Sequence, residues 1–128
     1  MSALQVAGVY IAINILMLVW FALRVVRHRF SGKISMGDGG SEPLARAIRV
    51  HGNATENIPA ALVGLLALAF LQGPVWSLHV IGIMFTLGRI SHSIGMDGGP
   101  VLCRQVGMLL TWISLVIVSL ALLYFAFT

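Results

Sequence analysis

The chain has 128 residues, of which 59% are hydrophobic and only 9% are charged, whereas about a quarter of residues in soluble domains are charged. So few charges cannot cover a water-facing surface, which excludes an ordinary soluble domain and indicates a protein solvated largely by lipid. The net charge of +4 is small and lies near predicted helix ends. It therefore indicates attraction to an anionic membrane surface rather than nucleic-acid binding.

The first predicted helix covers about residues 3–24. No charged residue occurs between Met1 and Leu23, and this span is long enough to cross a hydrocarbon layer of about 30 Å. It lacks the basic start and small-residue cleavage site of a signal peptide, so we expect it to be retained. Basic residues end the apolar span: Arg24, Arg27, His28, Arg29 and Lys33. Gly37-Asp-Gly-Gly40 then predicts a turn.

The second predicted helix covers about residues 42–72. Ser41 is placed to cap it and Pro43 is tolerated in its first turn. The first half of this helix carries polar groups, whereas residues 58–71 are almost wholly apolar. We therefore expect it to begin outside the hydrocarbon layer and to end within it.

The third helix is predicted over about residues 74–95 and the fourth over 100–127, with a turn at Asp97-Gly-Gly-Pro100 between them. No repeat, low-complexity tract or soluble segment is apparent along the chain. The sequence thus predicts an all-α fold, an integral membrane four-helix bundle that forms a single domain over residues 1–128.

The basic residues also predict the orientation in the membrane. Six of the eight Lys and Arg residues lie within residues 24–49, and the other two, Arg89 and Arg104, flank the third-to-fourth turn at the same face. Because cytoplasmic loops are enriched in Lys and Arg, we expect the 24–49 loop in the cytoplasm and both termini outside.

Polar side chains recur on the second helix at spacings of three and four, which place them on one helical face. They are Arg46, Arg49, Asn53 and Glu56. Arg89 and His92 share a face of the third helix, and Arg104 begins the fourth. A charged side chain within a membrane helix costs about 2.5–3.5 kcal/mol on insertion scales. These groups must therefore face the bundle interior or a cavity.

A charge count indicates what such a cavity binds. Arg49, Arg89 and Arg104 supply three positive charges against one negative charge from Glu56. A partly desolvated surplus of guanidinium requires an anion, and arginine matches carboxylates bidentately. The implied ligand is a small zwitterion with more than one carboxylate, reached from the cytoplasm.

Simpler interpretations exist for several of these residues. The basic residues of 24–33 serve as topology determinants in any membrane protein of this orientation, and Arg46 can be a solvated residue outside the bilayer. Arg49 and Glu56 can form a structural ion pair, and His92 can form an interhelical hydrogen bond without binding a ligand.

Other site chemistries are not favoured. His51 and His92 lack a third ligand, so no metal site is predicted. The glycines of residues 37–40 lack the lysine and threonine of a phosphate-binding loop. Cys103 is the only cysteine, which excludes an internal disulfide.

Two polar segments resemble those of the MAPEG family, membrane-associated proteins in eicosanoid and glutathione metabolism. They are Arg46-Ala-Ile-Arg49-Val-His51-Gly-Asn53-Ala-Thr-Glu56-Asn-Ile-Pro59 and Gly88-Arg89-Ile-Ser-His92. Arg104-Gln-Val-Gly-Met-Leu-Leu-Thr-Trp112 is similar to the bacterial branch. The resemblance implies a homotrimer in the bacterial inner membrane that binds glutathione between subunits near the cytoplasmic face.

The resemblance also implies a role for each matching residue. Arg49 and Arg89 would hold the carboxylates of glutathione, and Asn53 and Glu56 its polar backbone and amino group. His51 and His92 would line the same pocket. Arg104 would be catalytic, stabilising the sulfur of glutathione as a thiolate, because a neighbouring guanidinium lowers the pKa of a thiol.

The implied function is that of a microsomal-type glutathione transferase or peroxidase acting on apolar electrophiles or lipid hydroperoxides. Membrane lipids would surround the protein as further partners. The chain departs from the family pattern at Asn57, Met96 and Gln105, where tyrosine, tyrosine and serine are frequent. These departures favour an alternative, a non-catalytic membrane protein of the same fold that binds lipid or a partner. A transporter or channel is less favoured, since the chain lacks the broken-helix repeats typical of transporters.

Overall fold

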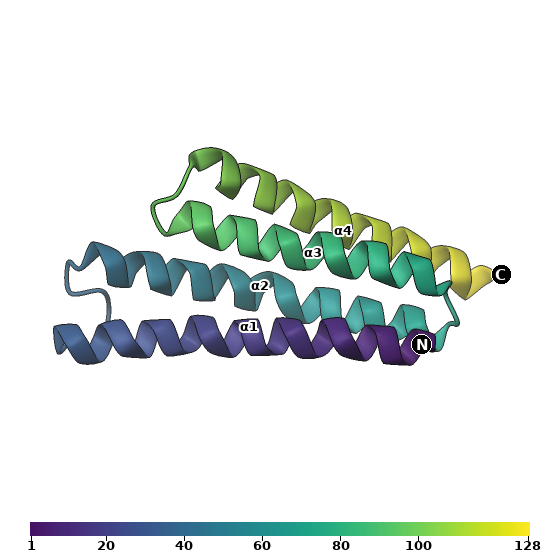
Figure 1. The fold of residues 1–128 in the computed structure, drawn as a ribbon, viewed down its shortest axis with the longest axis horizontal. Coiled ribbons are helices and arrows are strands. Elements are labelled where there is room, and N and C mark those ends of the chain that lie inside the picture. The colour runs from purple at the N-terminus through teal and green to yellow at the C-terminus, as the bar shows by residue number, and fades with distance from the viewer.

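The computed structural model describes residues Met1–Thr128 as four helices: α1 (Ala3–Gly32), α2 (Glu42–Phe70), α3 (Val75–Met96) and α4 (Val101–Phe127). No strand is present, which confirms the predicted all-α bundle. Both termini and the α2–α3 turn lie at one end, which we call the terminal end (Figure 1). The α1–α2 loop and the α3–α4 turn lie at the other end, which we call the loop end.

Helix α1 is longer than predicted. We expected it to end near residue 24, but it continues to Gly32. Arg24 ends the apolar span and not the helix, because arginine is itself a good helix former. The helix ends where Lys33 adopts a left-handed conformation (φ 52°) and its backbone N–H donates to the carbonyls of Arg29 and Phe30. The other helix bounds lie within two residues of the predicted ones.

Helix α2 begins as its sequence predicts. The Ser41 hydroxyl accepts a hydrogen bond from the Leu44 backbone N–H at 3.4 Å, with Pro43 in the first turn. Glu42, also in this turn, carries the negative charge that a helix N-terminus favours. The cap fixes where the polar face of α2 starts.

Three of the helices, α1, α2 and α4, are long and apolar enough to cross a membrane. Helix α3 carries four polar residues in its second half: Arg89, Ser91, His92 and Ser93. It is nevertheless long enough to span the hydrocarbon layer, at about 33 Å for a rise of about 1.5 Å per residue. Large apolar side chains are exposed on every helix, as lipid-facing surfaces require.

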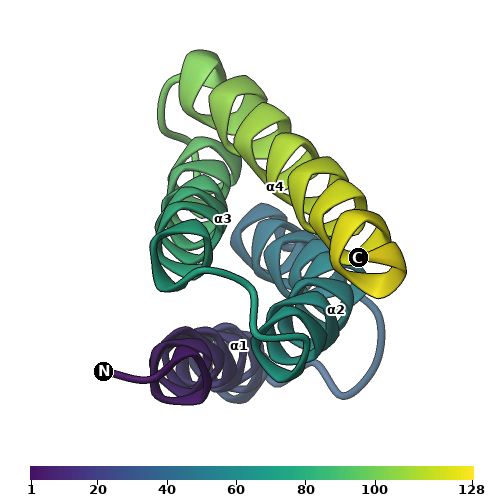
Figure 2. The ribbon, with the colours of Figure 1, turned by 90° about the vertical axis from the view of Figure 1, so that its right-hand side faces the viewer.

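Packing places α2 and α3 together at the centre of the bundle. Each of these two helices contacts all three others, whereas α1 and α4 do not approach one another closely (Figure 2). One core cluster includes Val6, Leu65 and Leu78, and a second, toward the loop end, includes Val50 and Phe85.

Glycines bring α3 and α4 unusually close together. A Cβ atom at Gly107 would overlap the backbone of His92, and one at Gly95 would overlap the backbone of Arg104. A Cβ atom at Gly88 would lie 3.1 Å from the Gly107 carbonyl oxygen. Small residues permit such close approach of membrane helices. This contact places the start of α4 directly beside the polar half of α3.

Candidate functional site

An open pocket of about 640 Å³ lies in the loop-end half of the bundle, between α2, α3 and α4. Four of the seven predicted site residues line it: Arg49, Asn53, His92 and Arg104. The remaining lining residues come from the end of α3 and the first half of α4: Met96, Gln105, Met108, Leu109 and Trp112. The pocket therefore joins a basic and polar side to a largely apolar side.

Arg89 lies behind this pocket and not on its surface. The side chain is fully buried, with an exposed fraction of 0%. Its Nη2 donates to Asn53 Oδ1 at 2.6 Å and lies 3.3 Å from His92 Nδ1. Its Nη1 donates to Thr111 Oγ1 at 3.4 Å. The direct contact with a ligand carboxylate that we expected for Arg89 would require this arrangement to open.

Arg89 determines the polarity of its neighbours. A guanidinium group can only donate hydrogen bonds, so Asn53 Oδ1 and His92 Nδ1 must both act as acceptors toward it. The remaining polar atoms, Asn53 Nδ2 and His92 Nε2, then carry hydrogens. Asn53 and His92 therefore bring hydrogen-bond donors to the pocket that they line, and the guanidinium groups of Arg49 and Arg104 add further donors.

Thr111 completes this network, and the prediction from sequence missed it. The hydroxyl is fully buried and donates to the Gly107 carbonyl at 2.8 Å, which turns a lone pair toward Arg89. A signal for it existed, because Arg104, Gly107 and Thr111 are spaced by three and four and share one face of α4.

Arg49 and Glu56 form only a loose contact. Their Nη1 and Oε1 atoms are 3.9 Å apart, and the side chains are 62% and 59% exposed. An exposed ion pair of this kind contributes about 0–1 kcal/mol. Glu56 lies outside the pocket lining, as does half-buried His51. These two predicted site residues are thus not brought into the pocket within one chain.

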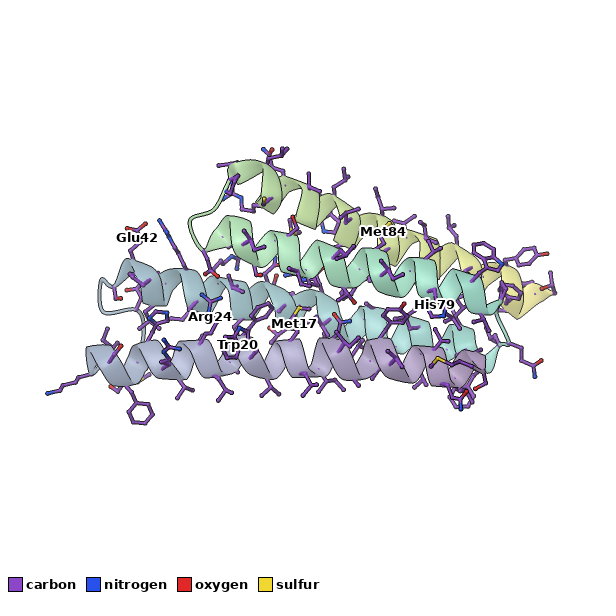
Figure 3. All side chains as sticks on the ribbon, in the orientation of Figure 1. Met17, Trp20, Arg24, Glu42, His79 and Met84 are labelled. Carbon is purple, nitrogen blue, oxygen red and sulfur yellow. The ribbon has the colours of Figure 1, made fainter.

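The other acidic residues do not neutralise the pocket. Asp97 pairs with Arg24 at 2.6 Å, and Glu42 pairs with Arg46 within α2. Figure 3 shows Glu42 pointing away from the bundle at the loop end. Arg104 has no acidic partner within ion-pair distance. The pocket and the buried layer behind it therefore retain the predicted positive surplus.

Buried Arg89 has no carboxylate within ion-pair distance either. Its Nε atom has no hydrogen-bond acceptor at all, although burying an unpaired charge is costly. Neutral oxygen and nitrogen acceptors on α2, α3 and α4 hold the cation in place. This arrangement creates a positive potential directly behind the pocket wall.

Comparison with known proteins identifies the family. The model of the MAPEG family matches residues 7–124. "Inner membrane protein YecN" of Escherichia coli strain K12 is 37% identical over 121 residues, which cover 94% of this chain and 92% of that protein. The protein of the same name from Escherichia coli O6:H1 matches to the same extent. With its apolar helices and its polar site between α2, α3 and α4, this integral membrane protein belongs to the MAPEG family.

Proposed function

We propose that this protein is a glutathione-dependent membrane enzyme, a transferase or peroxidase acting on apolar electrophiles or lipid hydroperoxides. The observation that carries the proposal is the donor-lined pocket, in which Arg49, Asn53, His92 and Arg104 face an apolar side and no acidic side chain lines the wall. A ligand that complements this wall must be rich in acceptors and negatively charged. Glutathione, with two carboxylates and a thiol, meets that requirement.

The size and charge of the surroundings support this ligand. A volume of about 640 Å³ falls within the range of about 300–1,000 Å³ for small-molecule sites. The loose contact between Arg49 and Glu56 leaves both groups free to exchange partners, so Arg49 would bind a carboxylate and Glu56 the ammonium group of the same ligand. The uncompensated charge of Arg89 would attract the ligand without touching it.

Arg104 would act on the sulfur atom. A free thiol has a pKa of about 8.5 and is mostly protonated at neutral pH, and an adjacent guanidinium lowers that value. In the transferase reaction the thiolate sulfur forms a bond to an electrophilic carbon, and the leaving group departs with the bonding electrons. In the peroxidase reaction the sulfur attacks the hydroperoxide, the O–O bond breaks to release an alcohol, and a second glutathione yields the disulfide and water.

The apolar side of the pocket would receive the second substrate. Met108, Leu109 and Trp112 follow one another along α4 and line the pocket beside Arg104. Leu109 and Trp112 are also exposed on the surface of the chain. An apolar substrate could therefore enter sideways from the bilayer and meet the sulfur at the junction of the two sides.

The assembly and orientation belong to the same proposal. We infer a homotrimer with glutathione between subunits, which would bring a neighbouring chain against the open side of the pocket. The protein would lie in a bacterial inner membrane, as the name of the E. coli relative states for that protein, with the loop end facing the cytoplasm. The clustering of basic side chains at the loop end supports this orientation.

One observation favours a second function, that of a non-catalytic protein that binds lipid or a partner. No hydroxyl group lines the pocket, and Asn57 donates to the Asn53 backbone carbonyl at 2.8 Å instead of facing a ligand. A steady rate of glutathione conjugation to a generic aryl halide would exclude this alternative.

The test is glutathione binding by purified protein, measured by titration calorimetry. Arg49→Ala removes a pocket guanidinium and should weaken binding about tenfold or more, since a charged hydrogen bond contributes about 1.5–3 kcal/mol. Arg46→Ala is the matched control, because Arg46 lies one turn earlier on α2, pairs with Glu42 and does not line the pocket. Equal affinity in the wild type and the Arg49 variant would contradict the proposal.

A further inference from the structure

We propose that the loop end of α1 binds one anionic phospholipid, with its phosphate between Arg29 and Lys33 and an acyl chain along the outer face of α1. This site is separate from the pocket described above and shares no residue with it. The proposal rests on a preformed hollow, on unneutralised charge within it and on an apolar stripe that leads into it.

The hollow has a volume of about 400 Å³. Its wall combines two cations and a hydroxyl with three apolar side chains: Val26, Arg29, Phe30, Lys33, Ile34 and Ser35. Such a wall complements a lipid headgroup: the cations and the hydroxyl can donate hydrogen bonds to a phosphate group, and the apolar side chains can contact the first carbons of an acyl chain.

The α1–α2 loop gives the hollow a fixed shape. The Ile34 backbone N–H donates to the Arg29 carbonyl at 3.0 Å, which turns the chain back on the helix. Arg29 Nη1 donates to the Gly37 carbonyl at 2.7 Å. Gly39 has a φ of +56°, and a Cβ atom there would lie 2.9 Å from Ile34 Cδ1. The loop is therefore tied to the helix end before any ligand arrives.

The charge in the hollow is not neutralised by the protein. The ion pairs of the chain involve Asp97, Glu42 and Glu56 with arginines elsewhere. The fourth acidic residue, Asp38, accepts a hydrogen bond from the Gly40 backbone N–H at 2.9 Å. Arg29 uses one N–H on the loop and keeps others for an anion, and the Lys33 ammonium has three donors. Together they complement a phosphate diester.

An apolar stripe identifies the anion as a lipid. Exposed apolar residues recur along α1 at spacings of three and four, and the last two line the hollow: Leu16, Val19, Leu23, Val26 and Phe30. At about 1.5 Å per residue, α1 is about 45 Å long and exceeds the hydrocarbon thickness of about 30 Å. Its basic end therefore lies at the level of lipid headgroups, where anionic lipids attract Lys and Arg. A free phosphate would use the cations but not the stripe.

The experiment compares retention of phosphatidylglycerol and phosphatidylcholine by the purified protein, using native mass spectrometry during titration. We expect one phosphatidylglycerol to bind with saturation, and phosphatidylcholine to bind at least about tenfold more weakly. Lys33→Asn and Arg29→Gln should each weaken phosphatidylglycerol binding about tenfold. Asparagine tolerates the left-handed backbone of position 33, so the first variant keeps the helix end intact.

Arg27→Gln is the matched control, because Arg27 is an exposed cation of the same helix end that does not line the hollow. An equal loss of binding in this control would show diffuse attraction and overturn the proposal. Inorganic phosphate that competes as well as the lipid would also overturn it. So would a symmetric crosslink between copies carrying Leu23→Cys, with no retained lipid, because the stripe would then be a protein interface.

Discussion

The two halves of the bundle both contain buried polar side chains but use them differently. In the terminal half, the Tyr10 hydroxyl lies 2.8 Å from His79 Nδ1, and Asn14 Nδ2 donates to Thr86 Oγ1 at 2.9 Å. Figure 3 shows His79 in this half. These neutral groups connect α1 to α3. In the loop half, a buried cation is held by neutral acceptors beside an open pocket.

The difference lies in the balance of donors and acceptors. The terminal half has one orphaned acceptor, Asn14 Oδ1, and no net charge. In the loop half, the N–H groups of Arg89 outnumber the acceptors around it. Asn53 and His92 turn their acceptor atoms toward Arg89, so their N–H groups are left to face the pocket. Polar residues of membrane helices connect the helices when their hydrogen-bond donors and acceptors pair with one another. They indicate a ligand site when they surround a charge that no protein group neutralises.

Among the substitutions in the two halves, Arg104→Ala in the loop half should have the largest effect, a loss of enzymatic turnover. We expect turnover of glutathione with an aryl halide to fall about 100-fold or more, the scale of a lost electrostatic stabiliser, while glutathione affinity changes less than about threefold. Steady-state kinetics and calorimetry on the same preparation separate the two effects. Arg104→Lys keeps a cation and should recover part of the rate. Unimpaired turnover in the alanine variant would refute the role of Arg104 at sulfur.

Arg89→Met tests whether a residue outside the pocket controls its polarity. Without the guanidinium, the Asn53 amide and the His92 ring are free to rotate, so we expect glutathione affinity to fall about tenfold. Asn14→Leu is the matched control, because it removes a buried polar group of the terminal half and should leave affinity unchanged. Equal effects of the two substitutions on glutathione affinity would show that the buried polar groups of the two halves do not differ in their role in binding.

Gly107→Ala tests the close approach of α3 and α4. The added Cβ would overlap the His92 backbone, so we expect a loss of about 1–3 kcal/mol in the free energy of unfolding. Gly8→Ala is the control, since nothing lies within 4 Å of a Cβ at that position, and it should be neutral or slightly stabilising. Denaturation in detergent measures both. Matching stabilities would contradict the glycine contact.

Tyr10→Phe should have the smallest effect. It removes the hydrogen bond to His79 and should cost about 0.5–1.5 kcal/mol of unfolding free energy, with glutathione binding unaffected. Thermal unfolding and calorimetry are sufficient to measure this. A change in glutathione affinity would show that the hydrogen bond between Tyr10 and His79 in the terminal half influences the pocket.

Helix number, order and approximate bounds could be predicted because lipid imposes strong constraints on composition. The uncharged run up to Leu23, the Ser41 cap and the glycine-containing turns each act locally. The end of α1 could not be placed, because the basic residues after Leu23 end the apolar span but remain good helix formers. The turn that stops the helix is set by the left-handed backbone of Lys33.

The site was only partly predictable for a physical reason. Helical spacing assigned Arg46, Arg49, Asn53 and Glu56 to one face of α2. Arg49 and Asn53 line the pocket, whereas Arg46 and Glu56 do not. Spacing does not indicate how deeply a side chain is buried. The burial of Arg89 behind Asn53 could therefore not be predicted, because it depends on a contact between residues 36 positions apart. The same limit applies to Thr111, whose role depends on how closely α4 approaches α3.

The most direct measurement compares the affinities of glutathione and its bis-carboxamide for the wild-type protein by calorimetry. The amide has nearly the same shape but replaces two anionic acceptors with neutral groups that themselves donate hydrogen bonds. A pocket lined by donors around unmatched arginines should bind glutathione at least about tenfold more tightly. Equal affinity, or tighter binding of the amide, would contradict this account of the pocket.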